Sequence, residues 1–296
     1  MPVLRLGRVT PQLVLAPSVV ASIIYVVCFS IWTLWLSLSN STMLPDYTYA
    51  GFHRYAALWR NHVWEIAYRN LFLFGILYVI GSLVVGLILA ILLDQRVRGE
   101  AVWRTILLYP LAVSFIVTGT VWRWIFAPDT GVQALVRSLG WHDFHFDWLV
   151  DRKLAIYTVV LAGIWQASGF VMVLLLAGLR SVDPDLLKAA RIDGASSARI
   201  YRRIVLPSIR PIVIAVVVIL LQFAIKTFDL VAALTGGGPG VATNVPAIFV
   251  YNFMFQRSEI AEGAAGAIMI VLALAIVLVP YGVWTGWRRR REAAAV

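Results

Sequence analysis

The chain has 296 residues, of which 61% are hydrophobic, with a mean hydropathy of +0.84 and a net charge of +10. Soluble globular domains are about 45–50% apolar, so this composition predicts a membrane protein. The positive charge lies between apolar segments and forms no basic stripe interleaved with aromatic residues, which excludes nucleic-acid binding. The single cysteine, Cys28, excludes an internal disulfide and a cysteine-based metal site.

Six apolar segments are long enough to cross a bilayer, since each has roughly 20 residues or more. They are 13–38, 71–93, 107–126, 156–179, 212–234 and 264–284. No segment alternates polar and apolar residues as a barrel strand does. We therefore predict an all-α polytopic membrane protein with a transmembrane domain over 13–286. A short cytoplasmic segment, 1–12, precedes this domain, and a basic cytoplasmic tail, 287–296, follows it.

The distribution of lysine and arginine predicts the orientation of these spans. One set of connecting segments, which includes Arg5, Arg8 and Arg96, carries 16 lysines and arginines, whereas the opposite set carries 7. The richer set faces the cytoplasm by the positive-inside rule. Both termini are then cytoplasmic, in a multi-pass protein of the cytoplasmic (inner) membrane.

The outer segment after the third span contains His142 and His145 at H-x-x-H spacing. No third ligand follows at a convincing spacing, so we predict no metal site there. No set of nucleophile, base and orienting residue is present either. A membrane enzyme that uses these histidines is therefore the weakest of the alternatives.

The segment between the fourth and fifth spans, 183–210, is basic and is predicted to form two short helices. Asp183 and Pro184 suit the start of the first helix, Gly194 suits a corner, and Ser196 or Ser197 can cap the second helix. Pro207 is expected to end the second helix. Each helix has one apolar face, which suggests docking into a groove of a partner.

The fifth span carries Gln222, Lys226, Thr227 and Asp229. In a continuous helix, Gln222, Lys226 and Asp229 would share one face, and Lys226 could pair with Asp229. Because charged residues inside a span are costly, this group is either a structural ion pair or part of a substrate pathway. A proton- or ion-coupled secondary transporter that uses Lys226 and Asp229 as a relay is a second interpretation of the whole chain.

The basic segment resembles the signature loop of binding-protein-dependent ABC importer permeases of the maltose and glycerol 3-phosphate type. The matching residues are Lys188-Ala189-Ala190, Asp193-Gly194-Ala195 and Ile204-Val205-Leu206-Pro207. Lys188 stands where these permeases usually have glutamate, so an ion pair that glutamate makes must be replaced here. The outer sequence Leu234–Pro239 is similar to a second motif of the family. We read its glycine run as a flexible turn, and the resemblance adds possible contact with a binding protein.

The resemblance implies a type I ABC importer permease fold with six transmembrane helices and a cytoplasmic coupling loop. It implies contact with an ATPase through Lys188, Ala189, Ala190, Asp193, Gly194, Ile204, Leu206 and Pro207. The expected partners are a dimer of ATPase subunits, a second six-span permease subunit, an extracytoplasmic substrate-binding protein and membrane lipid. No glycine is followed by lysine, so no phosphate loop is present, and this chain is expected to bind no cofactor itself. ATP and Mg²⁺ would be bound by the partner ATPase.

The resemblance also implies a sugar pathway through the membrane. Its predicted residues are Trp165, Gln166, Gln222, Lys226, Thr227 and Asp229. The amide and charged groups suit the hydroxyl groups of a sugar, and an aromatic ring suits its apolar face. A monosaccharide or small oligosaccharide is favoured over glycerol 3-phosphate, because a phosphate would require more than one buried cation.

Overall fold

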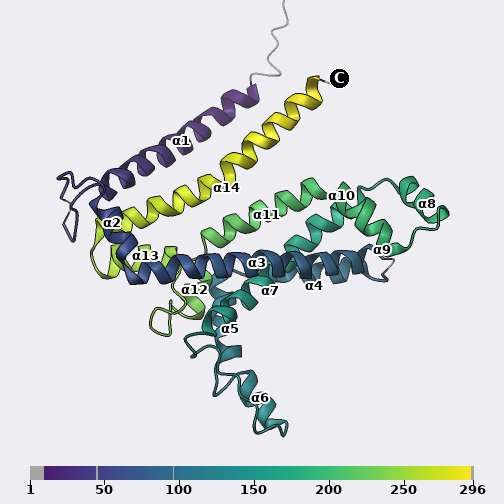
Figure 1. Ribbon diagram of the computed structural model, residues 1–296, viewed down its shortest axis with the longest axis horizontal. Coiled ribbons are helices and arrows are strands. Elements are labelled where there is room, and N and C mark those ends of the chain that lie inside the picture. The colour runs from purple at the N-terminus through teal and green to yellow at the C-terminus, as the bar shows by residue number, and fades with distance from the viewer. Residues whose placement is uncertain (1–9, 45, 96, 295–296) are drawn as a thin grey trace, which may run out of the picture. The chain divides into compact units, whose positions relative to one another are not determined.

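The computed structural model of the protein describes residues 10–44, 46–95 and 97–294 (Figure 1). Arg5, Arg8 and Arg96, which contribute to the predicted charge asymmetry, lie outside the described residues. Within the described ranges, the regular structure is helical apart from one isolated bridge between Ser39 and Tyr49. The chain divides into two compact units, Met1–Asn61 with Val250–Met269, and His62–Phe249 with Ile270–Val296.

The smaller unit contains α1 (Thr10–Ser37), α2 (His53–Arg60), the π-helical turn Asn252–Gln256 and the beginning of α14 (Ile260–Ala294). The Ser37 and Tyr55 hydroxyls are 2.7 Å apart, and Asn61 Nδ2 donates to Glu262 Oε1 over 2.8 Å. In contrast, the most apolar stretch of α1 has no buried residue. This helix therefore leaves its apolar side chains for lipid or a partner to cover.

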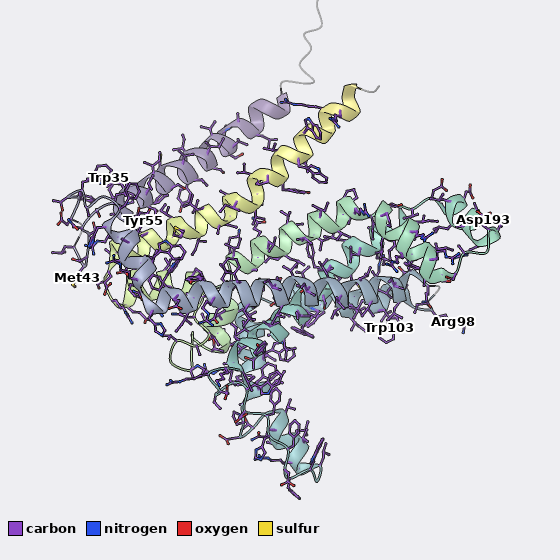
Figure 2. All side chains as sticks on the ribbon, in the orientation of Figure 1. Trp35, Met43, Tyr55, Arg98, Trp103 and Asp193 are labelled. Carbon is purple, nitrogen blue, oxygen red and sulfur yellow. The ribbon has the colours of Figure 1, made fainter. Side chains whose placement is uncertain are left out.

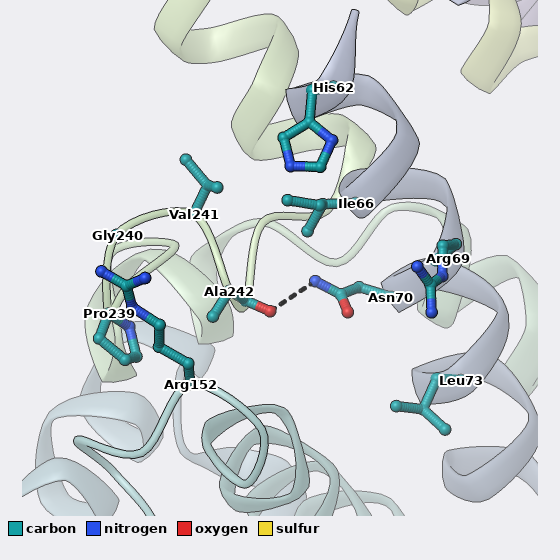
Figure 3. A pocket seen from close by; sticks show the side chains of 10 residues that line it. All are labelled: His62, Ile66, Arg69, Asn70, Leu73, Arg152, Pro239, Gly240, Val241 and Ala242. Carbon is teal, nitrogen blue, oxygen red and sulfur yellow. Dashed lines mark hydrogen bonds between the residues drawn. The ribbon is translucent and has the colours of Figure 1, made fainter.

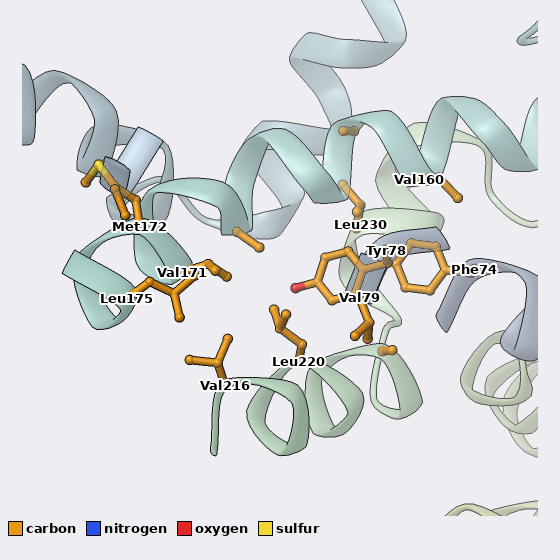
Figure 4. Packing of buried hydrophobic residues seen from close by; sticks show 14 of the residues in the cluster. Phe74, Tyr78, Val79, Val160, Val171, Met172, Leu175, Val216, Leu220 and Leu230 are labelled. Carbon is orange, nitrogen blue, oxygen red and sulfur yellow. The ribbon is translucent and has the colours of Figure 1, made fainter. Parts of the chain in front are cut away.

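The core of the larger unit is built on two long helices, α3 (His62–Asp94) and α7 (Ala155–Arg180). Against these pack α4 (Glu100–Ala112) and α11 (Arg210–Ile225). Phe74 and Tyr78 stack with ring centroids 5.1 Å apart, and Leu220 and Met172 are fully buried (Figure 4). α4 approaches α7 so closely that a Cβ on Gly169 would collide with the carbonyl oxygen of Leu107. Small residues at such contacts are typical of helix pairs in membranes.

The remaining helices of this unit are short. The structure has α5 (Phe115–Phe126), α6 (Val132–Ser138), α8 (Pro184–Ile192), α9 (Ser197–Ile200), the π-helical turn Tyr201–Val205, α10 (Leu206–Ser208) and α12 (Asp229–Leu234). The helix α13 (Pro246–Tyr251) begins here and ends in the smaller unit.

Four described helices are long and apolar enough to cross a membrane. They are Leu15–Ser37, His62–Asp94, Ala155–Arg180 and Ile260–Trp287, and they confirm as helices the predicted segments 13–38, 71–93, 156–179 and 264–284. Two bent helix pairs bring the number to six if each pair counts as one span.

The prediction that 107–126 and 212–234 are continuous helices is wrong, because each segment contains a break. In the first, α4 and α5 meet at a bend of 97°. Val113 is extended, and the Ser114 hydroxyl accepts a hydrogen bond from Val117 N over 3.3 Å, so a serine cap starts a new helix inside an apolar run. In the second, α11 ends at Ile225 and α12 begins at Asp229.

Candidate functional site

The base of the basic loop is held by Arg180, the last residue of α7. One terminal guanidinium nitrogen lies 2.9 Å from Glu100 Oε1, Nε lies 3.6 Å from Asp94 Oδ1, and the other terminal nitrogen donates to Leu93 O over 3.2 Å. A guanidinium can make these contacts together because its donors are arranged in a rigid planar fork. The ends of α3 and α7 and the start of α4 are thereby joined where the loop leaves the core.

The first loop helix, α8, forms as the sequence predicts. Asp183 Oδ1 accepts from Asp185 N over 2.8 Å, which caps the helix, and Pro184 occupies its first turn. Gly194 follows with φ of +77°, a conformation that glycine adopts readily and that confirms the predicted corner. Lys188 Nζ lies 2.8 Å from Asp185 Oδ1, so the residue that replaces the usual glutamate pairs with a carboxylate of its own helix.

The predicted role of the loop's apolar faces needs a correction. We expected both faces to await a partner, but Ile200 and Val205 are each 5% exposed and belong to the protein's own core. The exposed apolar side chains are instead at the loop tip, where Ile192 is 86% and Leu186 is 49% exposed. Asp193 lies at this tip (Figure 2). A docking surface would therefore be formed by the outer side of α8.

Pro207 does not end the second loop helix. The helical segment continues from Ser197 to Ser208, and the chain then bends by 68° at Ile209 before α11 begins. Pro207 lies one residue before the end of this segment, in the three-residue α10 that follows the π-helical turn Tyr201–Val205. Among the predicted coupling residues, Lys188, Ala189, Asp193 and Gly194 are exposed, whereas Ala190, Ile204, Leu206 and Pro207 are half-buried.

The predicted common face of Gln222, Lys226 and Asp229 is wrong, because the helix breaks between them. Lys226 caps the C-terminal end of α11, and Asp229 is the first residue of α12. Among the ion pairs of the described residues, none joins Lys226 to Asp229. Each charge instead suits the dipole of its own helix end, with the cation at a C-terminus and the carboxylate at an N-terminus.

This break forms a small cavity of about 110 Å³. It is lined by Phe115, Phe223, Lys226, Thr227, Phe228, Asp229 and Leu230. Phe115 comes from the start of α5, so both broken helices contribute to the cavity. Lys226 and Asp229 are exposed, Thr227 is buried and Gln222 is half-buried.

The two predicted residues of α7 lie beside the bend between α4 and α5. Gln166 is 2% exposed, and its Nε2 donates to the carbonyl oxygen of Val113 over 2.8 Å. Its Oε1 is buried and has no hydrogen-bond partner in the described structure. Trp165 is 40% exposed and packs edge-on against Trp122 of α5, with centroids 5.8 Å apart. Gln166 therefore positions the bend, and Trp165 keeps an accessible face.

Sequence reasoning missed a larger cavity of about 600 Å³ near the start of α3, at the other end of this helix from the Arg180 contacts (Figure 3). It is lined by His62, Ile66, Arg69, Asn70, Leu73, Arg152, Pro239, Gly240, Val241 and Ala242. Asn70 Nδ2 donates to Ala242 O and Asn244 O, each over 2.8 Å. The Thr243 hydroxyl donates to Gly238 O over 2.8 Å. The glycine-rich segment is thus a hydrogen-bonded turn rather than the flexible turn we expected.

The two outer histidines have separate surroundings. His145 Nδ1 lies 2.9 Å from a terminal nitrogen of Arg137, and the Arg137 Nε donates to Phe144 O over 2.9 Å. Because a guanidinium can only donate, Arg137 is the donor in this contact. Among the described residues, no group of three His, Cys, Asp or Glu side chains could hold a metal ion.

Comparison with known proteins gives the chain its family. Residues 82–291 match the family model described as binding-protein-dependent transport system inner membrane component. The chain is 38% identical over 275 residues to a probable ABC transporter permease protein of Pyrococcus horikoshii, covering 92% of this chain and 94% of the relative. It is 36% identical over 239 residues to a xylose/arabinose import permease of Haloferax volcanii. This match covers 80% of this chain and 75% of the relative.

The fold has a counterpart among solved structures. A chain from a bacterial ABC transporter that imports the acidic polysaccharide alginate superposes with a TM-score of 0.80 at 21% identity, covering 94% of this chain and 96% of that one. At this level of identity, the similarity concerns the helical fold.

Proposed function

The chain belongs to the family of binding-protein-dependent transport system inner membrane components, and from this premise we propose that it carries a sugar through the membrane as a permease subunit of an ATP-driven importer. The match over residues 82–291, which includes the whole basic loop, is the observation that carries the proposal. Relatives named for xylose and arabinose or for trehalose and maltose support a sugar as the substrate. A relative named for glycerol 3-phosphate makes this compound the competing substrate.

ATP hydrolysis belongs to separate subunits in this proposal. The chain has no glycine followed by lysine, so it lacks the phosphate loop that would hold ATP and Mg²⁺. A dimer of ATPase subunits would contact the exposed side of α8 through Ala189 and Asp193, with the apolar Leu186 and Ile192 beside them. Movement of the ATPase would be transmitted to the core because Arg180 joins the base of the loop to α3 and α4.

The substrate pathway would run past the helix breaks. Broken helices in transporters leave polar backbone groups and helix ends free to contact a substrate within the membrane. Here Lys226, Thr227 and Asp229 line such a break, and Gln222 precedes it on α11. Trp165 would stack on an apolar sugar face, while Gln166 would act by holding the bend at Val113.

The remaining partners are proposed because a transport pathway of this kind lies between two permease subunits, of which this chain is one. A second six-span permease subunit would complete the pathway, and an extracytoplasmic binding protein would deliver the sugar. The basic loop and both termini would then be cytoplasmic, in the inner membrane. The cavity near the start of α3 would open to the opposite side.

Purification and ATP hydrolysis together test this function. The full-length chain, expressed in its source cells, should retain an ATPase and a second permease during purification in mild detergent. After reconstitution in vesicles, the binding protein loaded with sugar should stimulate ATP hydrolysis. Retention of neither subunit, together with unstimulated hydrolysis, would contradict the proposal.

A further inference from the structure

The segment that leads from the loop into α11 has an unusual excess of positive charge. Between Asp193 and Asp229 the sequence contains no aspartate or glutamate, yet it contains Arg199, Arg202, Arg203 and Arg210. All four arginines are exposed, and none forms an ion pair with a described residue. Their charges are therefore available to an anion from outside this chain.

The helical segment Ser197–Ser208 presents Arg199, Arg202 and Arg203 at its exposed surface, and Arg210 follows after the bend as the first residue of α11. Its opposite side is fixed in the core, since Ile200 and Val205 are each 5% exposed and the following Ile209 is 1% exposed. Arg199, Arg202 and Arg203 consequently lie on the surface of a helix that cannot turn without unpacking the core.

A cavity at the bend combines positive charge with apolar surface. It measures about 320 Å³ and is lined by Arg202, Leu206, Pro207, Arg210, Val213 and Ile214. Two arginines mark its polar side, while Val213 and Ile214 belong to the apolar helix α11, where Ile214 is 40% exposed. A second cavity of about 400 Å³ beside it is lined by Ala198, Arg199, Arg202 and Arg203.

We propose that this elbow, formed by Arg202, Leu206, Pro207, Arg210, Val213 and Ile214, binds an anionic phospholipid. The lipid phosphate would accept hydrogen bonds from Arg202 and Arg210, because a guanidinium matches two phosphate oxygens at once. One acyl chain would lie along Val213 and Ile214, where the span enters hydrocarbon. A headgroup that also carries a cation would be disfavoured by the uncompensated arginines. Basic pockets at the ends of transmembrane helices bind lipid headgroups in this way.

The elbow has a structural consequence for transport that goes beyond the proposed function. The bend of 68° at Ile209 connects the basic helix to α11, and α11 leads to the break at Lys226. A lipid seated in the elbow would hold the angle between the basic helix and the span. The inference concerns one end of a span and does not depend on which side of the membrane that end faces.

Lipid retention by the full-length chain tests the proposal. The purified chain is equilibrated in detergent micelles that contain equal amounts of phosphatidylglycerol and phosphatidylcholine, and bound lipid is counted by native mass spectrometry. Wild type should retain phosphatidylglycerol preferentially. One basic side chain near a membrane surface strengthens attraction to anionic lipid by about fivefold, so Arg202→Gln with Arg210→Gln should weaken retention by about thirtyfold.

Two variants separate the elbow from general charge and from misfolding. Arg69→Gln with Arg152→Gln removes the same charge from the distant cavity and should retain phosphatidylglycerol as wild type does. Arg202→Lys with Arg210→Lys keeps the charge but loses the two-oxygen match, so it should retain more phosphatidylglycerol than the glutamine pair and less than wild type. The proposal is overturned if wild type shows no preference, if the glutamine pair at the elbow keeps it, or if the lysine pair retains no more lipid than the glutamine pair.

Two further arms identify the source of the phosphate. Inorganic phosphate and soluble glycerophosphoglycerol, added in excess, should leave the lipid bound because neither supplies an acyl chain. Displacement of the lipid by either would show a free-phosphate site and overturn the lipid assignment. In the assembled complex the preference should persist, and its loss there would mean that a partner subunit covers the elbow, which also contradicts the proposal.

Discussion

Gly194 shows how one residue sets the direction of the loop. Its φ of +77° lies in the left-handed region, and an added Cβ would meet no atom within 4 Å. A side chain there would therefore suffer backbone strain without a steric collision. The sequence allowed this position to be identified, because a glycine that follows a capped helix is typical of a corner. The predicted serine cap of the second helix is not seen, since Ser196 occupies the N-cap position without a side-chain hydrogen bond.

Gly194→Val should leave membrane insertion intact and weaken coupling to the ATPase. A β-branched residue in this conformation costs about 1–3 kcal/mol, which the loop can relieve by redirecting α9. Gly194→Asn is the matched control, since asparagine tolerates positive φ better than valine does. Co-purification of the ATPase and sugar-stimulated hydrolysis measure the effect. Equal values for the valine and asparagine variants would argue against a role for the corner.

Lys226 and Asp229 should be only weakly coupled. They line one cavity but lie on different helix ends without an ion pair, so Lys226→Gln and Asp229→Asn should show a coupling energy of about 0.5 kcal/mol, at the low end for neighbouring residues. Each single variant should also reduce uptake if the break lies on the pathway. A double-mutant cycle in detergent measures the coupling energy between the two residues. A coupling energy clearly above about 0.5 kcal/mol would support the ion pair that the sequence suggested.

At the scale of the helices, apolar length predicts where a span lies but does not predict a break within it. The long helices α3, α7 and α14 follow from continuous apolar sequence, and their bounds extend the predicted segments by only a few residues at most ends. The bend after α4 depends on a tertiary contact, the hydrogen bond from Gln166 to Val113 O. The sequence offered Ser114 as a cap, but a serine inside an apolar run also fits a continuous helix.

In the candidate site too, the sequence predicts local features but not those that depend on tertiary contacts. Loop residues such as Asp183 and Gly194 could be assigned because caps and corners depend on neighbouring residues in the sequence. The burial of Ile200 and Val205 could not be assigned, since it depends on how the loop folds back onto the core. The large cavity escaped prediction because Arg69, Arg152 and Pro239 come from segments far apart in the chain.

The contact between α4 and α7 provides a prediction at this scale. Gly169→Ala should destabilise the protein by about 1–3 kcal/mol, because the new methyl group meets the Leu107 carbonyl and the backbone must shift. Gly282→Ala on α14 is the control, since no atom lies within 4 Å of its added Cβ. Thermal unfolding in detergent compares the two. If Gly169→Ala were as stable as Gly282→Ala, the helices would not be packed as described.

For the whole molecule, we expect the spans to place the loop and the large cavity on opposite sides of the membrane. In a Cys28→Ser background, a cysteine introduced by Asp143→Cys should react with an impermeant thiol reagent added outside intact cells. One introduced by Ser197→Cys should react only after the cells are opened. Both positions are exposed, so access to the reagent depends on the membrane. If Ser197→Cys reacted with the reagent added outside intact cells, the loop would face outward and the predicted orientation would be wrong.

Two sources of energy for transport are compared at this level, ATP hydrolysis and an ion gradient. An importer of this family draws on ATP bound by its partners, whereas a secondary transporter would draw on an ion gradient through Lys226 and Asp229. The family match favours the first source over the second. In our proposal, the exposed side of α8 would be the surface that contacts the ATPase.

The most direct measurement is therefore sugar uptake into vesicles that contain the complete complex, with the energy source controlled. We expect ATP supplied to the ATPase side to support uptake without any ion gradient, and a protonophore to leave the rate unchanged. Uptake that proceeds without ATP and collapses when the ion gradient is removed would contradict this expectation.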